Sequence, residues 1–335
     1  MAIVGVVSAQ KPLNKAGLAA YFSRTHLQTG KSAQCNIRHV LLILLPMPTL
    51  LTAQQQAQYQ QNGYLVLPDF KTAADIAALR ARAEEIVNAF DPSGNISVFT
   101  TREQSRSVDD YFMGSANKVS CFFEEEAFDA TGQLKQDKAL SINKIGHAMH
   151  DLDPVFDQFS RGPALASLAA GLGLEQPKIW QSMYIFKQPG IGGEVRWHQD
   201  ATFFDTTPLS VTTFWFALED ASVRNGCLWV EPGGHRGPLR ERFVKQGGIG
   251  TTGAGPAAAI ETLDNSPWPD DHTAVPVEVS AGTLVVFHGL LPHYSAPNRS
   301  PVSRHAYTLH ATDGRSVYSP QNWLQRGADL PVRGF

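Results

Sequence analysis

The spacing of apolar and polar positions predicts helices in the first part of this chain and short strands in the second. Thr52-Ala-Gln-Gln has the capping-box pattern and Asn62-Gly63 is a good helix stop, so we expect a helix between them. Tyr64 to Pro68 then has the pattern of a strand. A second helix begins at Thr72, with Asp75 three residues on, and should pack on a sheet through its apolar face. That face consists of Ile76, Leu79, Ala83, Ile86 and Phe90.

Residues 91 to 173 carry weaker signals. Residues 91 to 130 have no clean period, and we expect Glu124-Glu125-Glu126 to form a solvated face. From Ser141 to Gly173 the pattern is helical, with breaks at Asp153-Pro154 and Gly162-Pro163, where proline suits a first helical turn. His147 and His150 could contribute to a metal site with Asp151 and Asp153. No further ligand pattern follows, so exposed polar side chains on a helix are the favoured interpretation.

After Pro177 the chain consists of short runs rich in β-branched and aromatic residues, separated by turn residues. Many short strands without helices between them indicate an antiparallel sandwich or barrel. Asn225-Gly226 predicts a hairpin turn. Residues 246 to 274 have no period and suggest a lid or substrate loop. The expected strands are 179–187, 211–218, 227–230, 275–279, 283–288 and 304–310.

Composition narrows the class of protein. With 335 residues, 43% hydrophobic residues and 18% charged residues, we expect one globular domain with ample core. The net charge of -3 gives no electrostatic reason to expect nucleic acid as a partner. Cys35, Cys121 and Cys227 are far apart and odd in number, which favours a reducing compartment, and we expect a cytoplasmic protein.

Residues 1–50 differ from the rest because they contain basic residues but no Asp or Glu. The segment could be a targeting peptide, in which case residues 1–46 would direct the protein to mitochondria or another organelle. Its apolar run, residues 40–45, is too short to span a bilayer. We slightly favour a third interpretation, in which the true start is Met47. The expected domains are a disordered or mis-assigned extension, 1–50, and a folded domain, 51–330.

His198-Gln199-Asp200 is the candidate for chemistry. In an extended strand His198 and Asp200 point to one face and Gln199 to the other. One imidazole and one carboxylate are two of the three protein ligands in the facial triad that binds non-haem Fe(II). Most such triplets are surface polar residues, so a second histidine is needed. The downstream candidates are His235, His272, His288, His293, His305 and His310.

Two arguments favour His293. The strand from Gly282 should continue to His293, and the turn-forming residues 295–301 then return the chain into a strand at Arg304. The residues that follow Arg304 on the same strand face, Ala306 and Thr308, are small and leave room for an anion. Arginine pairs with carboxylate through two parallel hydrogen bonds. The alternative is that Arg304 faces solvent.

His198-x-Asp200, His293 and Arg304, eleven residues later, resemble the Fe(II)- and 2-oxoglutarate-dependent dioxygenases of the phytanoyl-CoA dioxygenase family. The likeness runs from about residue 51 to about residue 325. It includes the blocks Ser141-Ile-Asn-Lys-Ile-Gly-His-Ala, Gln181-Ser-Met-Tyr-Ile-Phe-Lys-Gln-Pro, His198-Gln-Asp-Ala, Asn225-Gly-Cys-Leu-Trp and Ser319-Pro-Gln-Asn-Trp-Leu. One departure is Gly233-Gly234-His235, where relatives tend to have Gly-Ser-His.

The resemblance implies a mainly β fold with flanking helices, a double-stranded β-helix or jelly roll. It implies that Fe(II) is held by His198, Asp200 and His293. Arg304 and Ser295 would meet the distal carboxylate of 2-oxoglutarate. The remaining cosubstrate contacts would come from Lys144, Met183, Gln199 and Trp215.

The activity implied by the resemblance consumes O2 and converts 2-oxoglutarate to succinate and CO2. Because Asp200 is retained, where related halogenases have a small residue, we expect hydroxylation or oxidative demethylation of a small organic substrate. That substrate could be an acyl-CoA or another carboxylate, and the basic residues could meet its phosphates or form a solvated face. They are Arg236, Arg240, Arg242 and Lys245.

Two other classes of function stay open. One is a cupin-like, metal-dependent binding or sensor protein, and the other is a non-oxidative metalloenzyme with Zn(II). Arg304 with Ser295 argues against both, because neither needs an anchor for a dicarboxylate.

Deleting residues 1–48 should leave the melting temperature and 2-oxoglutarate turnover nearly unchanged, because these residues lack acids and lie outside the resemblance. Thermal unfolding and succinate release of the shortened protein test this. A large loss of folded protein would contradict it.

Overall fold

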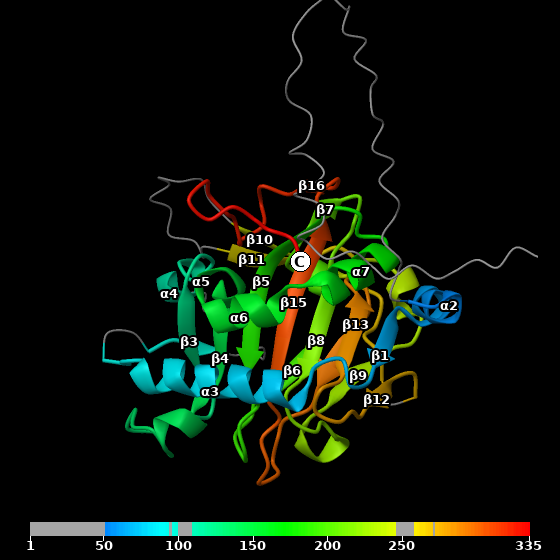
Figure 1. Cartoon of the computed structure of the whole chain (residues 1–335). Coiled ribbons are helices and arrows are strands. Elements are labelled where there is room, and N and C mark those ends of the chain that lie inside the picture. Colours follow the sequence, from blue (N-terminus) through cyan, green and yellow to red (C-terminus); the bar gives the residue numbers. More distant parts are fainter. Residues whose placement is uncertain (1–50, 94–95, 100–108, 246–257, 271) are drawn as a thin grey trace, which may run out of the picture. The chain divides into compact units, whose positions relative to one another are not determined.

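The computed structural model of the protein describes residues 51–93, 96–99, 109–245, 258–270 and 272–335 (Figure 1). The predictions for residues 1–50 lie outside these ranges, as does the part of the proposed lid at residues 246–257 and 271. Within the described residues, no helix is long and apolar enough to cross a bilayer. The α-helices are α2 (Ala53–Asn62), α3 (Ala73–Ala89), α4 (Asp110–Met113), α5 (Met149–Leu152), α6 (Pro154–Ser160) and α7 (Pro163–Gly171). The short 3-10 helices are η1 (Lys138–Leu140), η2 (Asp200–Thr202), η3 (Val223–Asn225) and η4 (Gly234–Arg236).

Most strands belong to two sheets. The larger has eight strands in the order β1-β13-β8-β15-β5-β4-β3-β2, and the smaller has four in the order β12-β9-β14-β6. The strands of the larger sheet are β1 (Tyr64–Leu67), β2 (Val98–Phe99), β3 (Val119–Glu124), β4 (Ile142–His147), β5 (Pro177–Ile185), β8 (Thr212–Ala217), β13 (Leu284–His288) and β15 (Ala306–Asp313). Those of the smaller are β6 (Val195–His198), β9 (Leu228–Val230), β12 (Val275–Val277) and β14 (His293–Ser295). Two ribbons pair β7 (Thr206–Thr207) with β16 (Val317–Tyr318) and β10 (Glu241–Lys245) with β11 (Ala258–Thr262).

The two sheets pack face to face through a shared apolar cluster. Trp215 and Phe287 from the larger sheet contact Leu228 and Val230 from the smaller one. Strands that are neighbours in space are distant in sequence, since β8 pairs with both β13 and β15. The expected jelly roll is therefore confirmed, with antiparallel pairing throughout except between β2 and β3.

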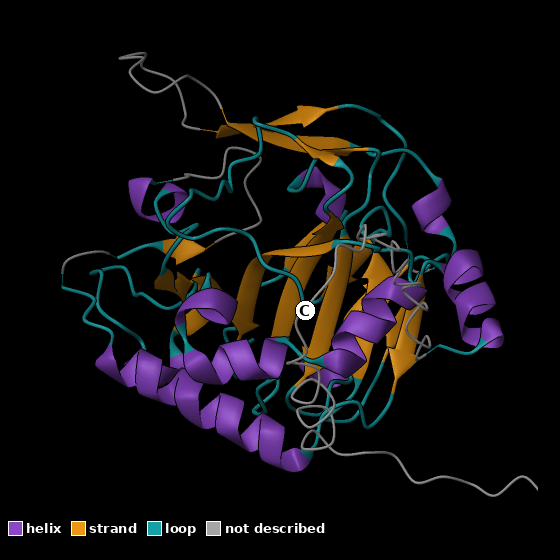
Figure 2. Ribbon diagram, turned by 45° about the horizontal axis from the view of Figure 1, so that its top comes forward, coloured by secondary structure: helices purple, strands orange, loops and turns teal. Residues whose placement is uncertain are grey.

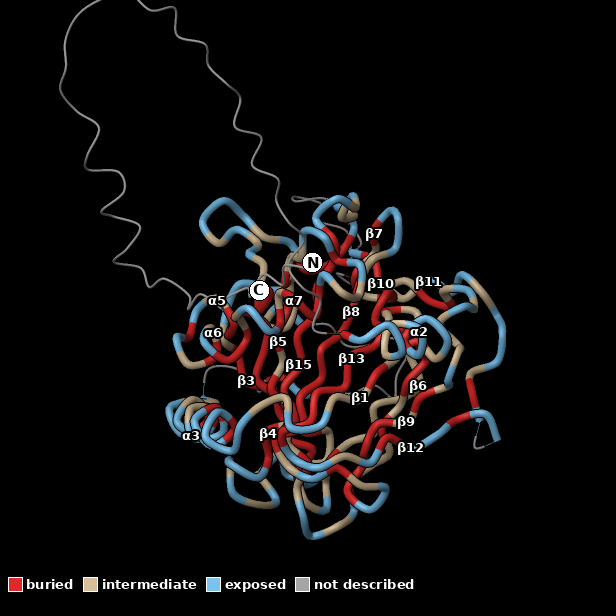
Figure 3. The backbone as a smooth tube through the Cα atoms, turned by 45° about the vertical axis from the view of Figure 1, so that its right-hand side comes forward, coloured by how far each residue is buried: buried red, intermediate tan, exposed pale blue. Residues whose placement is uncertain are grey.

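Helices cover the other face of the larger sheet (Figure 2). On β15, Tyr307 and Leu309 join the cluster that includes Phe156 of α6 and Leu168 of α7. All eight residues of β15 are buried, which Figure 3 shows as a continuous buried segment. Because successive side chains alternate, one face of β15 packs on helices and the other faces the smaller sheet.

The predicted helix starts are confirmed. Thr52 and Thr72 both form reciprocal capping boxes, with Gln55 and Asp75 respectively. Gly63 ends α2 with a φ of 82°, a left-handed conformation that glycine adopts without a steric penalty. The buried face of α3 differs by one position, since Val87 is buried where Ile86 is only half-buried.

Residues 141–148 are not helical, because β4 forms there and pairs with β3 and β5. The prediction that His147 and His150 are exposed is wrong. His147 lies 2.8 Å from the Ser115 hydroxyl, and His150 lies 2.9 Å from that of Ser182. Glu124 is also fully buried rather than solvated. Partners from distant segments satisfy these polar groups, and a local pattern does not reveal such partners.

Three connecting segments also differ from expectation. Asn225-Gly226 is a turn but not a hairpin, because it joins strands of different sheets. The chain likewise leaves the larger sheet after β13 and enters the smaller one at β14, so His293 is not on the same strand as His288. Strand β11 forms within the stretch predicted to be structureless, where residues 258–262 pair with β10.

Leu309→Ala should lower the free energy of unfolding by about 2–5 kcal/mol, because the side chain is fully buried among the helices. Leu152→Ala in α5 is the matched control, since Leu152 is 48% exposed, and should change it by less than about 0.5 kcal/mol. Urea unfolding followed by circular dichroism measures both. Equal losses would contradict the assignment of this face of β15 to the core.

Candidate metal and cosubstrate site

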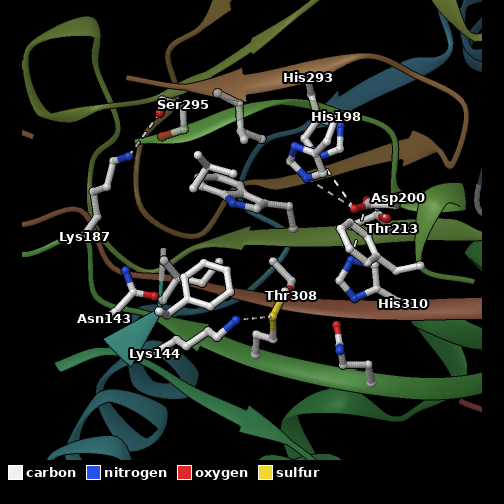
Figure 4. A pocket seen from close by; sticks show the side chains of 18 of the residues that line it. Asn143, Lys144, Lys187, His198, Asp200, Thr213, His293, Ser295, Thr308 and His310 are labelled. Atoms are coloured by element: carbon white, nitrogen blue, oxygen red, sulfur yellow. Dashed lines mark hydrogen bonds and ion pairs between the residues drawn. The ribbon is translucent and has the colours of Figure 1, made fainter. Parts of the chain in front are cut away.

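The register between β6 and β14 sets the position of two histidines. His198 and His293 are direct partners across this ladder, and their ring centroids lie 4.0 Å apart. Asp200 lies two residues after the end of β6, as the first residue of η2. The candidate ligand atoms of these three residues all lie within 4.8 Å of one another (Figure 4). Strand pairing and one tight turn therefore assemble a two-histidine, one-carboxylate group.

Each histidine is held by the backbone two residues before it. His198 Nδ1 lies 2.9 Å from the Arg196 carbonyl oxygen, and His293 Nδ1 lies 3.0 Å from that of Leu291. A carbonyl only accepts hydrogen bonds, so each Nδ1 carries the proton and each Nε2 keeps its lone pair. The two Nε2 atoms lie 3.6 and 3.7 Å from the same oxygen, Asp200 Oδ1.

The second oxygen of Asp200 has partners of its own. The Thr213 hydroxyl donates a hydrogen bond to Oδ2, and His310 Nε2 lies 3.5 Å from it. His310 is fixed by stacking on Phe204, at a centroid distance of 4.9 Å. These contacts orient the carboxylate and leave Oδ1 facing the two imidazoles. Thr213 was not predicted as a partner of Asp200, and His310 was predicted only as a rival metal ligand, although His310 shares its strand face with Arg304.

The protonation states suit a metal. Burial lowers the pKa of His293 to about 4, so its imidazole is neutral at physiological pH. Burial alone would raise the pKa of Asp200, but the neighbouring His293 and His310 hold it well below its usual range. Two imidazoles and one carboxylate, buried on one side and lining a pocket on the other, fit an Fe(II) ion with open coordination positions.

A cationic group lies in the same pocket. Arg304 is 2% exposed, and its Nε and Nη2 donate to the Gly226 carbonyl and the Ser295 hydroxyl at 3.0 and 3.3 Å. Its Nη1 is buried without a hydrogen-bond partner among the described residues. Burial lowers the pKa of Arg304 to about 10, so the guanidinium stays charged. An unpaired buried donor on a cation indicates a position for an anion.

Three more of the expected cosubstrate residues line this pocket: Lys144, Met183 and Trp215. Lys144 Nζ lies 4.0 Å from Met183 Sδ and 3.2 Å from the ring centroid of Phe99. The Arg304 guanidinium carbon lies 5.4 Å from the ring centroid of Trp215. The structure thus brings together residues from β4, β5, β8 and β14 with Arg304, which precedes β15.

Gln199 is the expected cosubstrate residue that the structure places elsewhere. Its Nε2 donates to the carbonyl oxygens of Pro238 and Leu290, both at 2.9 Å, and its Oε1 accepts from Arg240 N. All of these partners are backbone groups, and Gln199 does not line the pocket. Strand alternation turns it away from His198, so its side chain ties surrounding loops together instead of contacting a ligand.

The basic residues do not form one cluster. Arg236 donates to the Gln61 carbonyl, Arg240 lies over the Trp268 ring, and Arg242 pairs with Asp205. The remaining histidine candidates do not line the pocket. These are His235, His272, His288 and His305.

The fold and the donor set are those of metal enzymes built on a jelly roll. The sequence profile of the family described as Phytanoyl-CoA dioxygenase (PhyH) matches residues 59–306, so the chain belongs to that family. The expected family and enzyme class, a dioxygenase, are confirmed.

Curated relatives agree. The Oryza sativa subsp. japonica protein named Phytanoyl-CoA dioxygenase 1 is 48% identical over 285 residues, which cover 84% of this chain and 96% of the relative. The Arabidopsis thaliana Phytanoyl-CoA dioxygenase is 46% identical over 282 residues, 84% of this chain and 95% of the relative. The Bos taurus Phytanoyl-CoA dioxygenase domain-containing protein 1 is 42% identical over 288 residues, 84% of this chain and 97% of the relative.

Solved structures share the fold. The non-heme alpha ketoglutarate dependent carbocyclase SnoK from nogalamycin biosynthesis superposes with a TM-score of 0.57 at 19% identity, over 85% of this chain and 99% of that chain. EctD from S. alaskensis with bound Fe superposes with a TM-score of 0.54 at 20% identity, over 86% of this chain and 88% of that chain.

Thr213→Val should weaken Fe(II) binding roughly tenfold to a hundredfold, because the metal-facing carboxylate loses the hydroxyl that orients it. Thr212→Val is the matched control, since Thr212 is equally buried but faces away from the pocket, and should change the affinity less than about twofold. Anaerobic competition with a colorimetric chelator measures both. Equal affinities in the two variants would show that Thr213 does not support the metal.

Proposed function

We propose that this protein is an Fe(II)- and 2-oxoglutarate-dependent dioxygenase that hydroxylates or oxidatively demethylates a small organic substrate. It converts 2-oxoglutarate to succinate and CO2. The observation that carries the proposal is the presence, in one pocket, of the His198, Asp200 and His293 donor set and of the unpartnered Nη1 of Arg304. A metal centre alone would fit many functions. A metal centre that shares a pocket with a buried arginine, which can bind a carboxylate, fits a dicarboxylate cosubstrate.

Each residue has a role in this proposal. His198, Asp200 and His293 would hold Fe(II), and the side of this group that lines the pocket would receive the 2-oxo acid. Bound iron supplies the oxidative chemistry. Arg304 and Ser295 hold the distal carboxylate, which fixes the direction in which the 2-oxo end points. Met183, Trp215 and Lys144 form the walls between these two ends.

Relatives and neighbours support the cofactors. EctD from S. alaskensis has been solved with bound Fe and with 2-oxoglutarate and 5-hydroxyectoine. SnoN has been solved with Fe3+, alpha ketoglutarate and nogalamycin RO, at a TM-score of 0.54 and 18% identity. These ligands were bound to EctD and SnoN. For this chain, iron and 2-oxoglutarate are proposed because of the donor set formed by His198, Asp200 and His293.

The pocket walls also favour a class of substrate. Beyond the metal ligands, aromatic side chains line the pocket, and Phe112 stacks on Trp323 at a centroid distance of 4.7 Å. Such rings bind apolar portions of a ligand. An acyl-CoA or another carboxylate stays within the proposal. The separation of Arg236, Arg240 and Arg242 onto different partners removes one argument for a CoA phosphate site.

Anaerobic titration with Fe(II) and 2-oxoglutarate tests the proposal. A weak visible charge-transfer band should appear in the native protein and be absent in Asp200→Ala, which removes the anionic protein ligand. A screen of metabolites for compounds that stimulate succinate release would then identify the substrate. Absence of the band at saturating iron would leave a binding protein or a non-oxidative metalloenzyme as the function.

Arg304→Lys should raise the apparent KM for 2-oxoglutarate roughly tenfold to a hundredfold. Lysine keeps the charge but loses the planar pair of donors, and a charge-assisted hydrogen bond contributes about 1.5–3 kcal/mol. Arg304→Ala should be worse, since it leaves a buried carboxylate unpaired. Steady-state succinate assays measure both.

Arg299→Ala is the control. Arg299 lies in the turn before Arg304, is exposed, and pairs with Glu126 at 2.6 Å. Its removal should leave the KM unchanged. Equal effects at Arg299 and Arg304 would contradict the role given to Arg304.

A further inference from the structure

Lys187 is a further buried basic residue in the pocket. It lies two residues after the end of β5 and is 1% exposed. Its Nζ donates to the carbonyl oxygens of Gly193 and Ser295, at 2.7 and 3.2 Å. An ammonium group has three N–H donors, so these two acceptors leave one donor for another partner. Lys187 lines the same pocket as Ser295 and Arg304.

The backbone at Lys187 is held in an unfavourable conformation. Its φ is 43°, which is uncommon for a residue other than glycine, asparagine or aspartate. Asn298 Nδ2 donates to the Lys187 carbonyl at 3.0 Å, and Arg304 N donates to the same oxygen at 3.3 Å. Strained residues that are fixed by several contacts concentrate at functional sites, which is a reason to look for a role beyond packing.

Gly226 leaves room for the lysine side chain. A Cβ at this position would lie 2.6 Å from Lys187 Cε, closer than atoms tolerate. The Gly226 carbonyl accepts from both Arg304 Nε and Ser295 Oγ. Gly226 therefore orients Arg304 and Ser295 through its carbonyl oxygen, and its lack of a side chain leaves space for Lys187.

Two basic side chains, Lys187 and Arg304, are buried in this region with one acid, Glu124. Glu124 is fully buried and accepts from Asn143 Nδ2 at 2.8 Å and from Gly193 N at 3.0 Å. Gly193 thus joins Glu124, through its N–H, to Lys187, through its carbonyl. With Glu124 and Lys187 both ionised, Arg304 leaves these three groups with one net positive charge. One carboxylate neutralises it. Burial and the Arg304 charge also hold the pKa of Lys187 well below its usual range, which a bound anion would offset.

We propose that Lys187 is a second cationic anchor for the distal carboxylate of the cosubstrate, donating its third N–H beside Arg304 and Ser295. Figure 4 shows Lys187 and Ser295 at the end of the pocket away from His198, His293 and Asp200. A carboxylate there receives donors from both basic side chains, while the Ser295 hydroxyl donates to the Gly226 carbonyl and accepts from Arg304 Nη2. This inference rests on the proposed function, because it assigns a further residue to the 2-oxoglutarate site.

The test compares 2-oxoglutarate with 2-oxopentanoate, which has the same carbon chain but no distal carboxylate. Both chelate Fe(II) through the same 2-oxo acid end, so anaerobic titration of the charge-transfer band reports the affinity of each. Lys187→Met should weaken 2-oxoglutarate binding roughly tenfold to a hundredfold and change 2-oxopentanoate binding less than about twofold. Lys187→Arg should restore part of the preference for the dicarboxylate.

Lys71→Met is the matched control. Lys71 is partly buried and, like Lys187, donates to a backbone carbonyl, that of Phe159. Its Nζ lies 4.1 Å from the Phe159 ring centroid. It does not line the pocket, so its replacement should leave both affinities unchanged.

The outcomes separate the inference from the function beneath it. Equal weakening of both ligands in Lys187→Met, or no weakening, would show that Lys187 only ties Gly193 to Ser295, and would overturn the inference. A native protein that binds both compounds equally would instead contradict the proposed function.

If Lys187→Met and Lys187→Gln both fail to fold, the native Zn(II)-loaded protein provides the test. The lysines of this protein are isotopically labelled at nitrogen for NMR. The signal of a buried lysine ammonium group should shift on addition of 2-oxoglutarate and not of 2-oxopentanoate. Equal responses to the two compounds would overturn the inference.

Discussion

His198 and His293 face each other across two short strands, and the geometry of the site follows from that pairing. Strand β14 is also paired on its other side with β9, so its register is fixed twice. A slip by one residue would turn His293 to the opposite face of the sheet and separate it from His198 and Asp200. The metal site therefore depends on backbone hydrogen bonding, and Asp200 is the one ligand that a turn has to place.

The larger sheet supplies the other half of the site by the same alternation. Trp215 on β8 and Thr308 on β15 face the pocket, while Phe216 and Tyr307 pack among the helices. Burying a charge such as Arg304 is unfavourable unless its donors find partners. The apolar face of the same strands offsets that cost, because the polar and apolar side chains alternate along one rigid backbone.

The sequence revealed what depends on neighbours along the chain. The capping boxes at Thr52 and Thr72, the shared face of His198 and Asp200, and the small residues after Arg304 are all local patterns. Strand alternation predicted that Gln199 points away from His198, whereas the family resemblance implied a contact with the cosubstrate. The structure agrees with the strand alternation.

The residues that were misjudged are polar side chains whose partners come from elsewhere. Glu124 meets Gly193, and His147 meets Ser115. Glu124 lies in a segment without a clean period and His147 in one with a helical pattern, and the local pattern predicted that both are exposed. Only the pairing of β3, β4 and β5 brings their partners near. The burial of these groups is a property of the sheet, so it could not be predicted from a short window of sequence.

Three aromatic residues of the pocket wall have a different origin from the rest of the site. Phe112 lies in the single turn of α4, Phe203 follows η2, and Trp323 lies beyond the last strand, so no paired strand fixes these rings. A replacement there can reshape the cavity without shifting the register that aligns His198 with His293. Enzymes descended from one ancestor can thus differ in the substrate that they oxidise while they keep the same arrangement of metal ligands.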